Sequence, residues 1–195
     1  LEQCPDVATI VVPVGWTPEA TGEARPSSSR PVRSSAAGPI ERSEETDTVP
    51  GIDYSGQVVV GVDSLGRESP ALWEAAHIAM RRNSPLHIQA VITTTVIGPE
   101  WIPSQGDLER LIREGTEKLE AARAAIIEKH PDLDVRWTLF DGQPAEVLVR
   151  ASDTCDILVI GSRGRGGFAG LLLGSTSQSV LPYSAAPTMV VRVKR

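Results

Sequence analysis

Short apolar runs alternate with longer helix-forming stretches from residue 57 to the end of the chain. Such runs are typical of strands that are buried on both faces of a sheet. Strands that are separated by helices pair in parallel through right-handed crossovers. The sequence therefore predicts an α/β fold, a five-stranded parallel doubly wound sheet with helices on both faces. We predict strands over 58–62, 86–92, 134–140, 156–160 and 188–193, and helices over 69–83, 105–129, 144–152 and from Ser175 onward.

Two of the predicted helices carry a continuous apolar face. The first places Leu72, Ala76 and residues 78–80 on its inner side. The long helix repeats apolar residues at three- and four-residue steps, which indicates one stripe facing the sheet. Its members are Leu108, Leu111, Ile112, Leu119, Ala122 and Ile126.

The first quarter of the chain has a different composition. Residues 16–56 contain five prolines, two serine clusters and an acidic run from Glu41 to Asp47. Ordering such a segment costs about 1–2 kcal/mol per residue, with little apolar burial to offset it. We interpret residues 16–56 as a flexible Pro/Ser/acidic linker, residues 57–195 as the folded domain and residues 1–15 as a separate strand segment.

Charge and cysteine content exclude several classes of protein. The net charge is −6, and residues 1–56 hold nine of the carboxylates but only four arginines. A general nucleic-acid binder needs an excess of Lys and Arg, so no nucleic-acid partner is expected. No apolar run approaches the roughly 18 residues of a membrane helix, so no membrane partner is expected. Two cysteines without metal-ligand spacing favour a reducing, cytoplasmic setting.

A glycine-rich stretch, residues 161–176, leaves the fourth predicted strand and ends at a helix start. Five glycines fall within its first ten residues, and Gly174 and Ser175 close it. Glycines let backbone N–H groups approach an oxyanion, and a helix start adds free donors. Arg163 and Arg165 add positive charge. We predict a polyphosphate-binding loop; the alternative is a tight connection with Ser175 as a simple N-cap.

Two common phosphate-binding loops are excluded. No Gly-Lys-Ser/Thr follows a glycine loop, so the chain is not a P-loop NTPase. A dinucleotide fingerprint should follow the first strand of its unit. Here that strand leads into Gly61-Val62-Asp63-Ser64-Leu65-Gly66, which lacks the G-x-G-x-x-G order.

The spacing Gly161-x2-Gly164-x9-Gly174-Ser175 resembles the ATP-binding signature of universal stress proteins. Further matches across residues 57–195 are Val60-Gly61-Val62-Asp63, Gly142-x-Pro144, Asp156-Ile-Leu-Val-Ile-Gly161 and Ala186-Pro187-x-x-Val190-Val191. The resemblance implies a Rossmann-like fold of the adenine nucleotide alpha hydrolase-like type. It also implies the strand order 3-2-1-4-5 and binding of ATP, ADP or AMP.

The same resemblance implies which residues hold the nucleotide. Asp63 would lie beside the adenosine, and Val91 would contact adenine through its backbone. The residues around the ribose and phosphates would be Gly161, Gly164, Gly174, Ser175 and Thr176, with Arg163 inside the motif. No catalytic residue and no protein metal ligand is expected, although Mg²⁺ can ride on bound phosphates with few protein ligands.

Three functions are compatible with these residues. The favoured one is an ATP-binding regulatory module of the stress response, whose shape or partner affinity depends on nucleotide occupancy. The alternative is a slow ATPase or nucleotide hydrolase, against which the sequence offers no positioned general base. Asp63 is the only strand-end carboxylate of the motif, and the family places it by adenosine. A nucleotide-free dimerisation module would require the glycine loop to be blocked.

The amino-terminal segment resembles the end of the chain. Residues 9–14, Thr-Ile-Val-Val-Pro-Val, parallel residues 188–193, Thr-Met-Val-Val-Arg-Val, and each run follows a short Pro-containing stretch. Since the chain begins with Leu1, we expect it to be the tail of a tandem protein; the alternative is a chance valine-rich strand. The last strand of this family commonly mediates dimer pairing. We therefore expect residues 8–14 to pair with residues 188–193, in a homodimer or an intramolecular pseudo-dimer.

The remaining reactive side chains are interpreted as structural. His77, His87 and His130 fall in predicted elements or at a helix end, where packing or surface roles are expected. Cys155 precedes an apolar strand and is expected to pack as a small apolar group.

Overall fold

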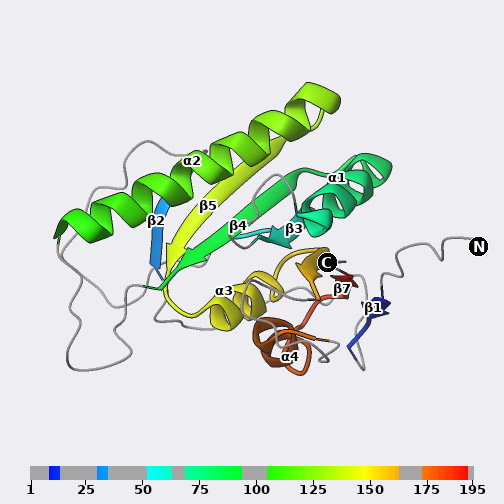
Figure 1. Ribbon diagram of the computed structural model, residues 1–195. Helices are drawn as coiled ribbons and strands as arrows, with labels where there is room; N and C mark the ends of the chain where they lie inside the picture. The colour runs from blue at the N-terminus through cyan, green and yellow to red at the C-terminus, as the bar shows by residue number, and fades with distance from the viewer. Residues whose placement is uncertain are drawn as a thin grey trace, which may run out of the picture.

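A seven-stranded sheet with helices on both faces forms the centre of the computed structural model (Figure 1). The structure describes residues 9–13, 30–34, 52–62, 69–93, 105–162 and 173–192, with the backbone alone at residues 30–34. The strands are β1 (Thr9–Val11), β2 (Arg30–Ser34), β3 (Val58–Gly61), β4 (Leu86–Ile92), β5 (Val135–Asp141), β6 (Ile157–Gly161) and β7 (Thr188–Val191). The helices are α1 (Pro70–Arg82), α2 (Gln105–Lys129), α3 (Pro144–Ala151) and α4 (Ser175–Val180).

Five of the strands form the predicted parallel sheet. Their order is β5-β4-β3-β6-β7, which is 3-2-1-4-5 when these strands are counted along the chain. The expected topology is therefore confirmed. β3 pairs in parallel with β4 on one side and with β6 on the other. The order reverses at β3, and ligands of doubly wound sheets bind at such a switch point, outside the carboxyl ends of the strands.

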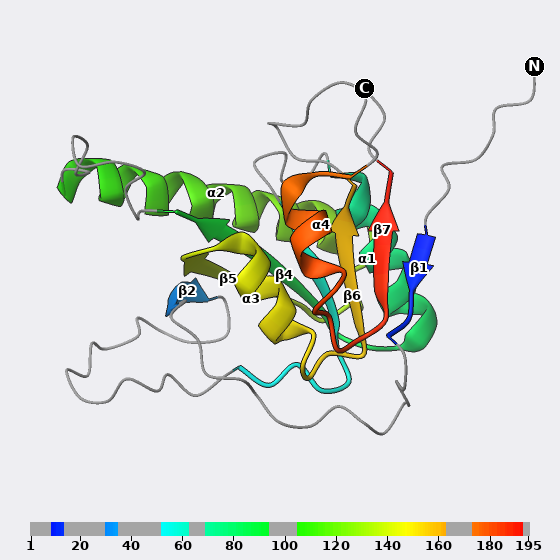
Figure 2. The ribbon, with the colours of Figure 1, turned by 90° about the horizontal axis from the view of Figure 1, so that it is seen from below.

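The helices cover the sheet in two layers (Figures 1 and 2). Side chains of a strand alternate between the faces, so Val58 and Val60 pack with α1 and α2, whereas Val59 packs with α3 and α4. Cys155 is fully buried in the second layer, which confirms its predicted apolar role. In the described part of the chain, no helix is both long and apolar enough to cross a membrane.

The inner face of α1 was predicted with one error. Leu72 and Ala76 are buried as expected, but Met80 is 44% exposed. Met80 lies eight residues beyond Leu72, which turns its side chain about 80° around the helix axis from that position. The other two residues of the predicted stretch 78–80, Ile78 and Ala79, are buried as expected. In α2 the stripe is fully buried only at Leu119, Ala122 and Ile126.

β1 covers one edge of the parallel sheet. It pairs antiparallel with β7, with Thr9 opposite Val190 and Val11 opposite Thr188. The expected pairing of residues 8–14 with residues 188–193 is thus confirmed at residues 9–11, and it forms within one chain (Figure 2). The side chains of β1 stay exposed.

β2 covers the opposite edge, where the sequence had predicted only flexible linker. It pairs antiparallel with β5, with Arg30 opposite Asp141 and Ser34 opposite Thr138. Pro31 has no N–H to donate, which an edge strand tolerates, and the register shifts between Pro31 and Arg33. The linker interpretation of residues 16–56 is therefore wrong at residues 30–34.

The predicted start of the domain at residue 57 is also too late. Tyr54 is only 3% exposed, and its backbone N–H donates to Thr154 Oγ1 at 3.0 Å. The N–H of Gly56 donates to Asp156 Oδ1 at 3.1 Å. These contacts hold residues 54–56 against the start of β6, so the folded domain begins before β3.

Candidate functional site

The carboxyl ends of β3, β4 and β6 lie at one edge of the sheet because the three strands are parallel and adjacent. Gly61, at the end of β3, is opposite Gln89 of β4 and Ile160 of β6. Val91 lies two residues beyond Gln89 and is half-buried. Gly161 ends β6. Two of the residues predicted to bind the nucleotide, Val91 and Gly161, therefore lie along the same edge.

The two ends of the glycine-rich loop are held together at this edge. Gly174 N–H donates to the carbonyl oxygen of Ser162 at 2.6 Å. The hydroxyl of Ser177, in the first turn of α4, donates to the carbonyl oxygen of Gly161 at 2.7 Å. Both bonds fix the start of α4 on the end of β6, so Gly174, Ser175 and Thr176 sit directly beside Gly161.

The start of α4 differs from the alternative in which Ser175 is a simple N-cap. Its N-cap residue is Gly174, with extended backbone angles φ −78° and ψ 164°, and no side chain caps the helix. Ser175 is the first helical residue and is exposed, while Thr176 is half-buried. The reading of Ser175 as a simple N-cap is therefore wrong. The first N–H groups of a helix have no intrahelical acceptor, which leaves donors on this side of the loop.

Backbone hydrogen bonds also fix the ends of β3 and β4. Val62 N–H donates to the carbonyl oxygen of Gln89 at 2.8 Å, so β3 stays paired beyond its last residue. Gly142 N–H donates to the carbonyl oxygen of Ile92 at 3.0 Å, and Thr93 Oγ1 donates back to Gly142 O at 3.0 Å. The backbone around Val91 is thereby held on both sides.

A side chain at position 61 would crowd Leu148 of α3. A Cβ atom at Gly61 would lie 2.7 Å from Cδ2 and 3.0 Å from Cδ1 of Leu148, which belongs to α3. Contacts that short force a neighbour to move, and Leu148 is itself buried. The absence of a side chain lets α3 pack closely against the end of β3.

We expect Gly61→Ala to lower the free energy of unfolding by about 1–3 kcal/mol, the usual cost of overpacking a well-packed core. Urea unfolding of the variant and of the original chain measures this difference. The same substitution in a Leu148→Ala background should cost clearly less, because the clashing methyl groups are gone. An equal penalty in both backgrounds would rule out Leu148 as the cause.

Three of the predicted site residues, Asp63, Arg163 and Gly164, lie outside the described residues. The structure brings the other five, Val91, Gly161, Gly174, Ser175 and Thr176, to the carboxyl edge of the sheet. Within the described ranges, no group of three or more His, Cys, Asp or Glu side chains could hold a metal ion.

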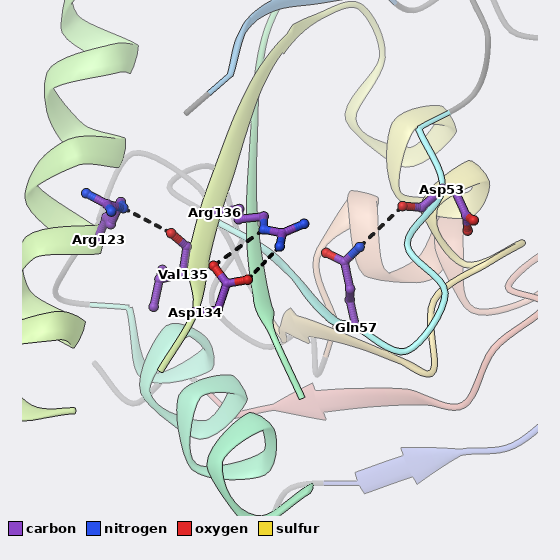
Figure 3. Close-up of polar contacts among 6 residues, drawn as sticks. All are labelled: Asp53, Gln57, Arg123, Asp134, Val135 and Arg136. Carbon is purple, nitrogen blue, oxygen red and sulfur yellow. Dashed lines mark hydrogen bonds and ion pairs between the residues drawn. The ribbon is translucent and has the colours of Figure 1, made fainter. Parts of the chain in front are cut away.

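The sequence did not predict a buried polar cluster behind this edge. The turn that carries Tyr54 is closed by Gln57 N–H to Tyr54 O at 2.9 Å and by Gln57 Nε2 to Asp53 O at 3.3 Å (Figure 3). The Tyr54 ring meets His87 edge-on, with centroids 4.8 Å apart. His87 Nε2 and Thr138 Oγ1 are 2.9 Å apart. The sequence signal that could have indicated this cluster is the pair of polar residues at alternate positions of β4, His87 and Gln89.

Burial determines the protonation of this cluster. The His87 pKa is lowered to about 4, first by burial and then by the charge of Arg136, which Asp134 partly opposes. His87 is therefore neutral at pH 7. Burial also raises the pKa of Tyr54 well above its usual value.

Sequence comparison identifies a family model and curated proteins that are similar to this chain. A sequence model of the universal stress protein family matches residues 55–192, more than half of the chain. Universal stress protein Rv2623 of Mycobacterium tuberculosis is 30% identical over 158 residues, which cover 79% of this chain and 51% of that protein. The chain spans about half the length of the curated relatives that it matches.

Solved structures share the fold. The universal stress protein UspA from Lactobacillus plantarum superposes with a TM-score of 0.58 at 22% identity, covering 72% of this chain and 99% of that chain. A universal stress protein solved in complex with cAMP is 27% identical, has a TM-score of 0.48 and covers 73% of this chain and 100% of its own.

Proposed function

The chain belongs to the universal stress protein family, and on this premise we propose that it binds an adenine nucleotide at the carboxyl edge of its sheet. The nucleotide would be ATP, with ADP or AMP as the related ligands, and Mg²⁺ would be held mainly by the phosphates. Its occupancy would make the domain a nucleotide-dependent regulatory module of the stress response.

One observation carries this proposal. The start of α4 is fastened to the end of β6 by the bonds from Gly174 N–H to Ser162 O and from Ser177 Oγ to Gly161 O. The long glycine-rich loop therefore begins and ends at one point, next to the switch point of the sheet. Loops of this composition approach oxyanions through their backbone N–H groups, and the loop carries the family spacing Gly161-x2-Gly164-x9-Gly174-Ser175.

Each site residue has a proposed task. The backbone of Val91 contacts the adenine, and the carboxylate of Asp63 binds the ribose side of the adenosine. The backbone N–H groups and hydroxyls of Ser175 and Thr176 bind phosphate oxygens. Gly161, Gly164 and Gly174 leave room for the ribose and phosphates, and Arg163 adds positive charge next to them.

Regulation is favoured over hydrolysis because the tasks assigned above include no general base. Asp63 is committed to the adenosine end, away from the terminal phosphate where water would attack. We infer that any ATP turnover is slow compared with the lifetime of the complex.

Incubating the purified chain with ATP·Mg²⁺ tests both parts of the proposal. We expect close to one adenine nucleotide retained per chain after gel filtration, with released phosphate well below one equivalent. Bound nucleotide is quantified after denaturing the protein, and phosphate is measured in the same sample. Many equivalents of phosphate would identify a slow ATPase, and no retained nucleotide would contradict nucleotide binding altogether.

The last strand suggests how the module pairs. In this structure β1 of the same chain occupies the free edge of β7. We infer that this intramolecular pairing, the pseudo-dimer of the two alternatives, takes the place of a strand from a second copy. Covering an exposed edge also protects it from unspecific strand pairing.

A further inference from the structure

The ends of β6 and β7 lie side by side at the edge that carries the proposed nucleotide site (Figure 2). Gly161 and Val191 are the last pair of their parallel register. The pairing continues one position further, because Ser162 N–H donates to the carbonyl oxygen of Val191 at 2.7 Å. In a parallel ladder this bond places Arg192 beside Ser162, about 4.8 Å away across the sheet. Arg192 therefore stands where the glycine-rich loop leaves β6.

The loop also returns on the side of the sheet to which position 192 points. Side chains of β7 alternate between the faces, and Val190 packs in the core under α3 and α4. Position 192 has the same parity as Val190, so Arg192 lies on this face. The returning end of the loop is fixed there as well, because Gly174 N–H donates to the carbonyl oxygen of Ser162. Both ends of the loop are therefore next to Arg192.

Arg192 is the one charged residue in this part of the chain. Residues 157–162 and 173–192, which contain β6, α4 and β7, include no other Lys, Arg, Asp or Glu. The Arg192 side chain is exposed, and within the part of the chain that the structure describes it forms no ion pair. A guanidinium stays protonated at every physiological pH. This end of the sheet therefore presents a positive charge that no neighbouring carboxylate of β6, α4 or β7 offsets.

The opposite end of the same edge has no such excess of charge. Asp141 ends β5, which lies four strand positions from β7, a separation of about 19 Å. Its partner in the register with β2 is Arg30, so a negative and a positive residue stand opposite each other there. An anionic group bound along this edge is therefore attracted toward the β7 end.

We propose that Arg192 binds the terminal phosphate of the nucleotide and gives the site its preference for ATP over AMP. This inference rests on the proposed nucleotide binding and adds to it a residue that distinguishes between phosphate chain lengths. The planar guanidinium can donate two parallel hydrogen bonds to the oxygens of one phosphate.

The strand order explains why Arg192 would contact the last phosphate and not the first. The proposed adenine contact, Val91, belongs to β4, and the next strands along the edge are β3, β6 and β7. A nucleotide whose adenine lies at β4 and whose phosphates lie at β6 extends its phosphate chain toward β7. The phosphate farthest from the adenine therefore comes nearest to Arg192, whereas the single phosphate of AMP ends before it.

The exposure of Arg192 determines how this contact behaves. Because the side chain is exposed, its interaction with a phosphate is partly screened by dissolved salt. The added affinity for ATP should therefore decrease as the NaCl concentration rises. AMP binding, which does not use Arg192, should depend less on salt.

Equilibrium dialysis of the intact chain with ATP·Mg²⁺, and separately with AMP, tests the assignment. The variant Arg192→Gln removes the positive charge and keeps a long polar side chain. We expect it to weaken ATP binding roughly 10- to 100-fold, the usual range for a hydrogen bond to a charged group, and to weaken AMP binding clearly less. Arg192→Lys should fall between the two, because an ammonium group keeps the charge but lacks the planar fork.

Arg81→Gln is the matched control, because it removes the same charge from an exposed arginine in the last turn of α1. This turn precedes β4 and lies at the amino ends of the strands, away from the proposed site. The control should bind ATP and AMP as the original chain does, and urea unfolding verifies that each variant folds.

Two results would overturn the role of Arg192 while nucleotide binding stands. One is an Arg192→Gln variant that binds ATP with unchanged affinity. The other is an equal loss of affinity for ATP and AMP, which would indicate a general effect on the site and not recognition of the terminal phosphate. An original chain that binds neither nucleotide would contradict the proposed function itself, and the role of Arg192 with it.

Discussion

Replacing Gly174 by Val should weaken ATP binding at least about 100-fold, equivalent to about 2.7 kcal/mol, while the fold survives. Gly174 is the N-cap of α4, and its N–H is committed to Ser162 O at 2.6 Å. A β-branched side chain there occupies the space through which a phosphate would reach the N–H groups and hydroxyls of Ser175 and Thr176. The backbone angles of Gly174 are extended, which valine adopts readily, so the helix start can persist.

Equilibrium dialysis with ATP·Mg²⁺ measures the affinity, and near-ultraviolet circular dichroism with urea unfolding verifies the fold. Ser179→Val is the matched control, because Ser179 is exposed in the same helix and gains the same kind of side chain. The control should bind ATP as the original chain does. If Gly174→Val bound ATP with unchanged affinity, the phosphates would have to lie somewhere else.

The parallel sheet could be predicted because the residue types of its strands indicate whether each strand is buried. The apolar runs at 58–60 and 157–160 are typical of strands buried on both faces, and the helices between the strands favour a doubly wound sheet. The strand 86–92 and the helix 105–129 have the predicted bounds. The pairing of residues 9–11 with β7 was expected from the family resemblance, which implies that the last strand pairs with a second strand of its own kind, and residues 9–14 resemble that strand.

β2 could not be predicted in this way. Its sequence, Arg-Pro-Val-Arg-Ser, has no apolar run and lies among prolines and serines. What makes it a strand is the unpaired edge of β5, which offers backbone donors and acceptors to whichever segment reaches it. That information belongs to the folded sheet and not to residues 30–34.

In the candidate site, too, the features that are local in sequence could be predicted and those that depend on the folded sheet could not. The glycine spacing around Gly174 is local in sequence and was found from the residues. The contact of Tyr54 with His87 joins a residue assigned to the linker to one assigned to a strand. The bond between His87 and Thr138 spans 51 positions. Such contacts depend on strand order and register, which the spacing of single residues does not reveal.

Lowering the pH from 7 to 5 should remove about 2 kcal/mol of stability through His87 alone. The pKa of His87 is lowered from its ordinary value of 6.5 to about 4 by burial, with a further contribution from Arg136. Arg136 is itself held by Asp134, with Arg136 Nη2 2.6 Å from Asp134 Oδ2 (Figure 3). Between pH 6.5 and pH 4, His87 binds a proton in the unfolded chain but not in the folded chain. Protonation therefore favours unfolding, and stability falls as the pH falls.

Urea unfolding at several values between pH 7 and pH 5 measures this slope, above the range in which most carboxylates titrate. His87→Gln should flatten it, because glutamine can still bond to Thr138 but takes up no proton. His77→Gln is the matched control, since it makes the same substitution at a histidine that is exposed on α1. An equally steep slope in His87→Gln would show that other groups cause the acid sensitivity. A flattened slope would identify His87 as the group through which acid destabilises the fold.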